Sequence, residues 1–417
     1  MSLFGPRAGL AYGALGLPLA FVALPLYVLL PNFYATEFGV PLALLGAVLL
    51  GARLLDAVAD PLIGRWVDRL FAQSTRRALL AAGAAALVLA LGFHALFFPL
   101  VEGTAALLWW CAIVLAITYL AFSTITVVHQ AWGARLGGDE GQRTRVVAWR
   151  EAAAVIGVLV ASVLPSLAGL SVTSATFAVL LVLGLVLLAR APQPAPNPAA
   201  AAENHALLLP FRSGAFRRLL LIFLLNGVAS AVPATLVLFF IRDRLQVPSW
   251  EPVFLVAYFA AGALSIPLWV RVVGRIGLAR AWLAGMVLAI LSFVWAFTLG
   301  AGDTLGFLAV CIASGVALGA DLALPGALLT GVIQQNGHAG RAEGAYLGWW
   351  NFATKLNLAL AAGVALPLLA AFGYSPGSRD PAALLALSIA YCLLPCALKL
   401  LAATALWTLW LRRPIHH

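Results

Sequence analysis

Two aspartates, Asp56 and Asp60, stand four residues apart inside a long apolar stretch of the sequence. Residues with this spacing share one face of an α-helix, so the two carboxylates can act on the same ligand. Arg53 lies three residues before Asp56 and supplies one positive charge beside them. Two carboxylates and one guanidinium leave a net negative charge, and hard cations prefer oxygen ligands. The pattern therefore predicts a Na⁺, Li⁺ or H⁺ site at Asp56 and Asp60, with Arg53 as its local charge balance.

The depth of these aspartates in the apolar stretch argues against a purely structural role. Arg65 marks the end of the stretch, and at ~1.5 Å per residue Asp56 lies ~13 Å inside that end. An intramembrane carboxylate costs ~3 kcal/mol or more unless it is paired. A closed ion pair between Arg53 and one aspartate is the alternative, but such a pair uses only one of the two acids.

Lys355 and Asp321 are further charged residues that lie deep in apolar stretches. Lys355 stands ~18 Å into its predicted helix, too deep for easy snorkelling to the membrane surface. We expect Lys355 to be a counter-charge to Asp56 and Asp60 that competes with the cation. Asp321 is expected to line the substrate cavity or to titrate, and an ion pair between Asp321 and Lys355 is the alternative.

Polar and aromatic residues in the same stretches are candidates for substrate binding. They are Thr126, His129, Gln130, Trp132, Trp350 and Asn351. A packing or interhelical hydrogen-bond role is the alternative for each. The sequence contains no cluster with metal-ligand spacing, no nucleophile elbow and no P-loop, so we expect neither an enzyme nor an ATP-driven pump, and no cofactor beyond the coupling ion.

The composition indicates that these segments lie in a lipid bilayer rather than in water. Hydrophobic residues make up 63% of the chain and charged residues only 10%, too little polar surface for a soluble protein of 417 residues. The net charge of +10 comes from arginines in short loops, so the partner is the lipid bilayer rather than a nucleic acid. Continuous apolar runs favour membrane-spanning helices over a β-barrel.

The apolar runs predict an all-α membrane protein with twelve spans. The spans are 8–31, 41–66, 78–100, 105–134, 146–168, 172–190, 216–241, 250–272, 280–300, 304–334, 345–372 and 382–411. With the N-terminus inside, only Arg242, Arg244 and Arg379 fall outside, which predicts a multi-pass protein of the bacterial inner membrane with both termini cytoplasmic.

A proline-rich linker and an internal repeat divide the chain into two predicted halves. Residues 1–190 and 216–417 each hold six spans, and residues 191–215 form a cytoplasmic linker. The segment 60–69 aligns without gaps to 266–275, but the positions of Asp56 and Asp60 are Gly262 and Ile266 in the second copy. Two such parallel halves are the major facilitator pattern, with the substrate site between them.

The segment around the two aspartates resembles the second-helix motif R-x-x-D-A-x-x-D-P-x-x-G of the glycoside-pentoside-hexuronide:cation symporters, the melibiose carrier family. The matching residues are Arg53, Asp56, Ala57, Asp60, Pro61 and Gly64. The segments 13–16, 142–145 and 341–346 resemble other parts of that family. The resemblance implies the major facilitator fold, a cation site at Asp56 and Asp60, and coupling through Lys355. It also implies a substrate-binding role for Arg150, since the family has a substrate-linked arginine at the start of its fifth helix.

The residues of the family's sugar site are not kept. Leu17 and Pro18 replace its first-helix Lys-Asp pair, and Thr126 and Gln130 replace its fourth-helix acid and aromatic. We therefore expect a monomeric Na⁺- or H⁺-coupled symporter for a small organic solute, glycoside-like or amphiphilic and lysolipid-like, that works by alternating access. The alternatives are a proton-coupled exporter of hydrophobic compounds in which Asp321 titrates, and a non-transporting receptor or scaffold.

Overall fold

The computed structural model describes residues 4–194, 207–374 and 377–412, and every regular element in this part of the chain is a helix. The earlier elements are α1 (Pro6–Gly13), α2 (Gly16–Leu24), η1 (Pro25–Leu29), α3 (Leu30–Glu37), α4 (Leu42–Gln73), α5 (Thr75–Phe97), α6 (Thr104–Arg135) and α7 (Glu140–Arg190). The later elements are α8 (Leu209–Arg212), α9 (Gly214–Phe239), η3 (Phe240–Arg244), η4 (Pro248–Trp250), α10 (Glu251–Ile276), α11 (Leu278–Phe297), α12 (Thr304–Gln335), α13 (Glu343–Ala371), α14 (Pro381–Ser388), η5 (Ile389–Leu393), α15 (Leu394–Leu406) and η6 (Trp407–Leu411).

The helices are suited to a bilayer. Within the described residues, nine helical segments are long and apolar enough to cross a membrane. One of them, α7, contains two predicted spans, 146–168 and 172–190, separated at Gly169 with φ 78°. Large apolar side chains such as Leu87, Trp109 and Leu264 are exposed on the helix surfaces, where lipid would cover them.

The chain packs as two compact units. The first contains Met1–Arg212 and Ile333–Phe352, and the second contains Ser213–Val332 and Ala353–His417. The break at Arg212 falls inside the predicted linker 191–215. Residues 333–352 pack with the first unit although they belong to the second predicted half. The division of the sequence into halves at 190 and 216 remains a prediction.

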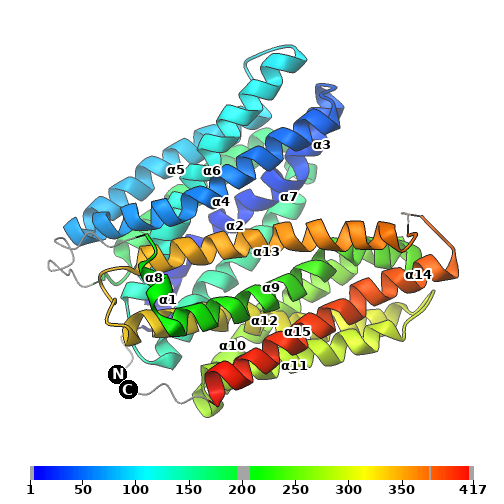
Figure 1. Cartoon of the computed structure of the whole chain (residues 1–417). Coiled ribbons are helices and arrows are strands. Elements are labelled where there is room, and N and C mark those ends of the chain that lie inside the picture. Colours follow the sequence, from blue (N-terminus) through cyan, green and yellow to red (C-terminus); the bar gives the residue numbers. More distant parts are fainter. Residues whose placement is uncertain (1–3, 195–206, 375–376, 413–417) are drawn as a thin grey trace. The chain divides into compact units, whose positions relative to one another are not determined.

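Small residues bring the helices of the first unit together. Helices α4 and α5 both pack on α6, as Figure 1 shows, and α2 packs on α7. The start of α13 meets α4 backbone to backbone, because a Cβ on Gly64 would lie 2.0 Å from the carbonyl oxygen of Gly344. Gly348 also lies close to the backbone at Asp60, where its Cβ would stand 2.5 Å from the carbonyl oxygen. This close approach holds the segment of α4 that carries the two aspartates against the start of α13.

The second unit has its own core. Helices α9 and α11 pack on α15, side by side in Figure 1. Aromatic rings fill one end of this core, and the rings of Phe240 and Tyr391 stack with centroids 4.2 Å apart. Glycines again allow close approach, since a Cβ on Gly315 would lie 2.4 Å from the carbonyl oxygen of Tyr258. Helices α9, α10, α11, α12 and α15 therefore enclose a common interior in the second unit.

Candidate functional site

Helix α4 carries both predicted cation ligands on its buried face. Asp56 is 2% exposed and Asp60 is 0% exposed, whereas Arg53 is an exposed residue. Arg53 lines a cavity of about 290 Å³ in the first unit, together with Tyr119 of α6. Because two acids are buried one helical turn apart, a positive charge beside this face of α4 lowers its free energy.

A residue that the sequence reading did not single out completes this group. The hydroxyl of Ser123 on α6 donates a hydrogen bond of 2.6 Å to Asp56 Oδ1. Ser123 lies three residues before Thr126, the spacing of neighbours on one helix face. That periodicity is the signal that could have added Ser123 to the candidates.

The other candidates on α6 have different surroundings. Thr126 Oγ1 and Gln130 Oε1 are buried, and neither has a hydrogen-bond partner among the described residues. His129 Nε2 lies 2.8 Å from the carbonyl oxygen of Tyr12, and the two rings are 4.5 Å apart. Thr126 and Gln130 thus retain capacity for a polar ligand, whereas these His129 contacts join α1 to α6.

Four further candidates occupy structured positions in the first unit. Trp132 is fully buried and donates to the carbonyl oxygen of Pro192 at 2.9 Å. Arg150 forms an ion pair of 2.6 Å with Glu151. Trp350 and Asn351 are buried on α13. The hydrogen bond uses the single N–H donor of the Trp132 side chain, and the ion pair uses part of the donor capacity of Arg150. A substrate role for the four residues stays a prediction.

Asp321 lies at the centre of a polar network in the second unit. Its Oδ1 accepts hydrogen bonds from Asn226 Nδ2 at 3.0 Å and Trp282 Nε1 at 2.9 Å. Its Oδ2 accepts from Ser230 Oγ at 3.2 Å and forms an ion pair of 2.8 Å with Lys399 Nζ. Lys399 is thus the ion-pair partner of Asp321. It was recognisable as one of two lysines in the chain, deep in the last predicted span.

Lys355 is the other deep lysine, and it lies on α13 in the second unit, where it is partly buried. Asp56 and Asp60 belong to the first unit. The coupling of Lys355 to these two acids stays a prediction.

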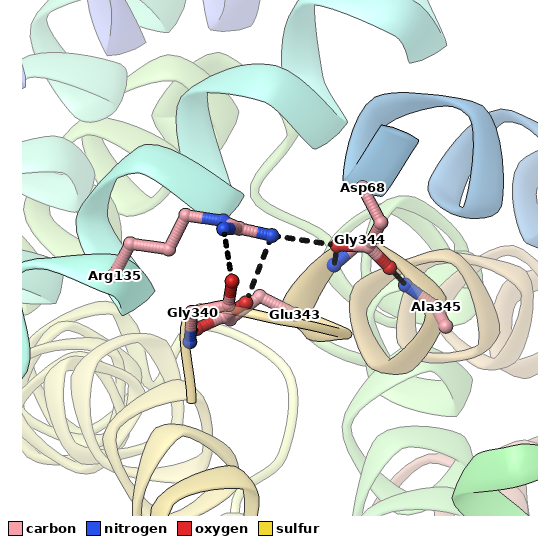
Figure 2. Close-up of polar contacts among 6 residues, drawn as sticks. All are labelled: Asp68, Arg135, Gly340, Glu343, Gly344 and Ala345. Atoms are coloured by element: carbon pink, nitrogen blue, oxygen red, sulfur yellow. Dashed lines mark hydrogen bonds and ion pairs between the residues drawn. The ribbon is translucent and has the colours of Figure 1, made fainter. Parts of the chain in front are cut away.

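An ionic cluster joins α4, α6 and the start of α13 inside the first unit (Figure 2). Arg135 Nη2 lies 2.9 Å from Asp68 Oδ1 and 3.0 Å from Glu343 Oε2. Asp68 also accepts the backbone N–H groups of Gly344 at 2.7 Å and Ala345 at 2.8 Å. These are first-turn amides of α13, which lack partners within the helix and favour a negative charge.

Two acids share one guanidinium in this cluster, which lies beyond the predicted spans 41–66 and 345–372. Burial raises the pKa of Asp68 to about 7, with Glu343 adding to the rise and Arg135 and the two backbone N–H groups opposing it. Burial also raises the pKa of Glu343, against the opposing effect of Arg135. The cluster therefore tends to hold a proton near neutral pH.

Comparison with known proteins places the chain in a family. The family model described as MFS/sugar transport protein matches residues 8–413. Among curated proteins, no relative matches the chain.

Solved structures give the same fold. A bacterial homologue of the iron transporter ferroportin, in an outward-facing state, has a TM-score of 0.71 at 18% identity, covering 95% of this chain and 99% of that chain. The E. coli fucose:proton symporter has a TM-score of 0.64 at 14% identity, covering 96% and 97%. The human organic anion transporter MFSD10 (TETRAN) has a TM-score of 0.61 at 19% identity, covering 96% and 100%.

These likenesses confirm the predicted major facilitator fold, and the family match extends over nearly the whole chain. The chain is thus an all-α multi-pass membrane protein and a secondary transporter rather than an enzyme. It belongs to the MFS/sugar transport protein family of the major facilitator superfamily.

Proposed function

We propose that this transporter is a symporter of the melibiose carrier type, which couples uptake of a small organic solute to Na⁺ or H⁺. The observation that carries the proposal is the burial of Asp56 and Asp60 on one face of α4. The second copy of the sequence repeat has Gly262 and Ile266 in their places, so the general fold of a half does not require the acids. A function particular to the first half, namely cation binding, explains their presence.

The chemistry of this group suits a hard cation. Asp56 and Asp60 supply carboxylate oxygens, and the hydroxyl of Ser123, which is hydrogen-bonded to Asp56, is a third oxygen-bearing group nearby. Sodium takes such oxygen ligands by analogy with other hard cations, and a proton would neutralise one carboxylate instead. Either ion offsets the free-energy cost of buried negative charge. In this proposal Arg53 balances the second acid, and Lys355 competes with the cation.

The proposed substrate contacts lie on α6 and beyond it. Thr126 and Gln130 hold buried oxygen atoms without partners among the described residues, and a polar group of the solute would satisfy them. His129, Trp132, Arg150, Trp350, Asn351 and Asp321 remain proposed lining residues. A glycoside-like or an amphiphilic, lysolipid-like solute fits this mixture. The proposed setting is the bacterial inner membrane, with both termini cytoplasmic and one chain as the transporting unit.

The experiment is a thermal unfolding titration of the purified protein with NaCl, LiCl and choline chloride at constant ionic strength and several pH values. A ligand that binds only the folded state raises the melting temperature with its concentration. We expect Na⁺ or Li⁺ to stabilise the protein relative to choline, or a drop in pH to do so in an Asp68→Asn background, where the separate titration of Asp68 is absent. Asp56→Asn should abolish the response. Equal melting curves in all conditions would remove the basis of the proposal.

The alternative function is proton-coupled export of hydrophobic compounds. The ion pair between the buried Lys399 and the partly buried Asp321, beside an apolar cavity, favours it. Dye efflux from proteoliposomes separates the two functions. Efflux driven by a pH gradient, unaffected by Na⁺ and lost in Asp321→Asn, would favour the exporter, whereas Na⁺-dependent solute uptake lost in Asp56→Asn would favour the symporter.

A further inference from the structure

A cavity of about 130 Å³ lies in the interior of the second unit, among α9, α10, α11, α12, η5 and α15. Five aromatic side chains line it: Phe254, Tyr258, Phe259, Phe293 and Tyr391. A cavity of ~150 Å³ in another protein's apolar core is large enough to bind benzene. The cavity can thus hold one aromatic ring or a short branched alkyl group.

The same cavity has a charged wall. Lys399 and Asp321 are both among its lining residues, and their ion pair measures 2.8 Å. The carboxylate of Asp321 already accepts from four donors, which come from Asn226, Ser230, Trp282 and Lys399. Its lone pairs are therefore largely occupied by the protein itself.

The hydrogen-bonding capacity of Lys399 is not occupied to the same extent. Its ammonium group has three N–H donors, and among the described residues it donates to Ser230 Oγ at 2.9 Å and to Asp321 Oδ2 at 2.8 Å. One donor remains for an acceptor beside the cavity. A ligand in this place would find an apolar aromatic chamber and one cationic donor, whereas a ligand cation would meet the Lys399 ammonium instead of open carboxylate oxygens.

We propose that this cavity is a binding site for a small organic monocarboxylate with an aromatic or branched alkyl body. The carboxylate accepts a hydrogen bond from Lys399 Nζ, and the body packs among Phe254, Phe293 and Tyr391. Asp321 acts as a positioning residue that holds the ammonium at the cavity wall. The site lies within one unit, so binding there does not depend on the cation coupling proposed above.

The test compares three probes of similar size on the purified full-length protein in lipid nanodiscs, by calorimetric titration. The probes are benzoate, benzyl alcohol and benzylamine. We expect benzoate to bind at least tenfold more tightly than either of the others. Similar Kd values for all three, tighter binding of benzylamine, or no benzoate binding at millimolar concentration would each overturn the proposal.

Two variants locate the binding. Ala317→Leu places three further carbon atoms on a buried lining residue and leaves the polar network intact, so benzoate binding should be lost while the melting temperature stays near that of the wild type. Lys399→Met combined with Asp321→Asn removes both charges without leaving either one alone, and it should erase the tenfold preference for benzoate over benzyl alcohol. Undiminished benzoate binding in either folded variant would contradict the site.

The binding assay and the cation titration test the two proposals independently, so either proposal can be refuted without the other. A protein that binds benzoate in a Lys399-dependent way but shows no response to Na⁺ or H⁺ would support this site and argue against the proposed symport. A protein that responds to Na⁺ through Asp56 but binds no benzoate would do the reverse.

Discussion

The Ser123 hydroxyl on α6 lies 2.6 Å from Asp56 Oδ1 on α4 and donates a hydrogen bond to it. The contact links two helices of the first unit at the depth where the sequence places the cation site. Because a hydroxyl oxygen can both donate to a carboxylate and bind a hard cation, Ser123 is suited to hold Asp56 in place when the cation leaves.

Removal of either acid should abolish cation dependence. In Asp56→Asn and Asp60→Asn the group loses one negative charge, so Na⁺-dependent stabilisation and Na⁺- or H⁺-dependent uptake should fall to background while insertion and folding persist. Ser123→Ala should weaken the apparent cation affinity, by about tenfold for the loss of ~1.4 kcal/mol. Cation-stimulated flux retained in both aspartate variants would contradict the assignment, and Ser162→Ala, an exposed serine of α7, serves as the control.

Lys355→Ala should change coupling rather than stability. If Lys355 competes with the cation for Asp56 and Asp60, its removal should alter the apparent affinity for the cation and separate cation flux from solute flux. Parallel measurement of labelled sodium and labelled solute uptake in proteoliposomes checks this outcome. Normal cation affinity and unchanged stoichiometry in a well-folded Lys355→Ala protein would show that the lysine has another role.

Lys399 should behave differently from Lys355, because its partner is known. Lys399→Met leaves the partly buried Asp321 carboxylate without its ion pair. Loss of one member of a buried pair destabilises proteins by roughly 3–5 kcal/mol, and the partial exposure of Asp321 favours the lower end of this range. Adding Asp321→Asn should restore most of the melting temperature because no charge is left alone. Thermal unfolding of the single and double variants in the same detergent decides the matter, and a double variant as unstable as Lys399→Met would refute this account.

The ionic cluster of Asp68, Arg135 and Glu343 should make stability depend on pH. The pKa of Asp68 rises from 3.8 to about 7 on folding, so the folded state binds the proton more tightly than the unfolded state. The resulting stabilisation is fully present below the unfolded-state pKa of 3.8, and it is lost as the pH rises through the folded-state pKa of about 7.

We expect the melting temperature of the wild type to fall between about pH 5 and about pH 8 more steeply than that of Asp68→Asn, which lacks this titrating group. Melting curves of both proteins across that range provide the comparison. Parallel slopes for the two proteins would show that Asp68 does not titrate there.

The backbone contact between α4 and α13 should tolerate no side chain. A Cβ on Gly64 would stand 2.0 Å from the carbonyl oxygen of Gly344, so Gly64→Ala should separate the helices and destabilise the protein by ~1–3 kcal/mol. Gly51 lies on the same helix, and apart from the adjoining turn of that helix no atom stands within 4 Å of the position that its Cβ would take. Gly51→Ala should therefore be neutral or stabilise by up to ~1 kcal/mol. Equal melting temperatures for the two variants would contradict the packing argument.

The sequence by itself determined the class of the protein. Continuous apolar runs longer than a bilayer's width permit only helices there, because the backbone must bond to itself where water is absent. The same logic exposes Asp56, Asp60 and Lys355, since a charge inside an apolar run is too unfavourable to be incidental. The spacing of residues along one helix decides which of them share a face, and this is a local property. The shared face of Asp56 and Asp60 could therefore be predicted from the sequence.

The partners of these charges were decided only by the tertiary structure. Nothing local to Asp321 distinguishes Lys355 from Lys399 as its partner, and the packing of α9, α12 and α15 selects Lys399. Ser123 becomes a neighbour of Asp56 only because α4 packs on α6. Likewise, Asp68, Arg135 and Glu343 lie on three helices far apart in the chain, and the close approach of Gly64 to Gly344 brings them together. Pairing between distant segments depends on how whole helices pack, which a one-dimensional pattern of residue types does not encode.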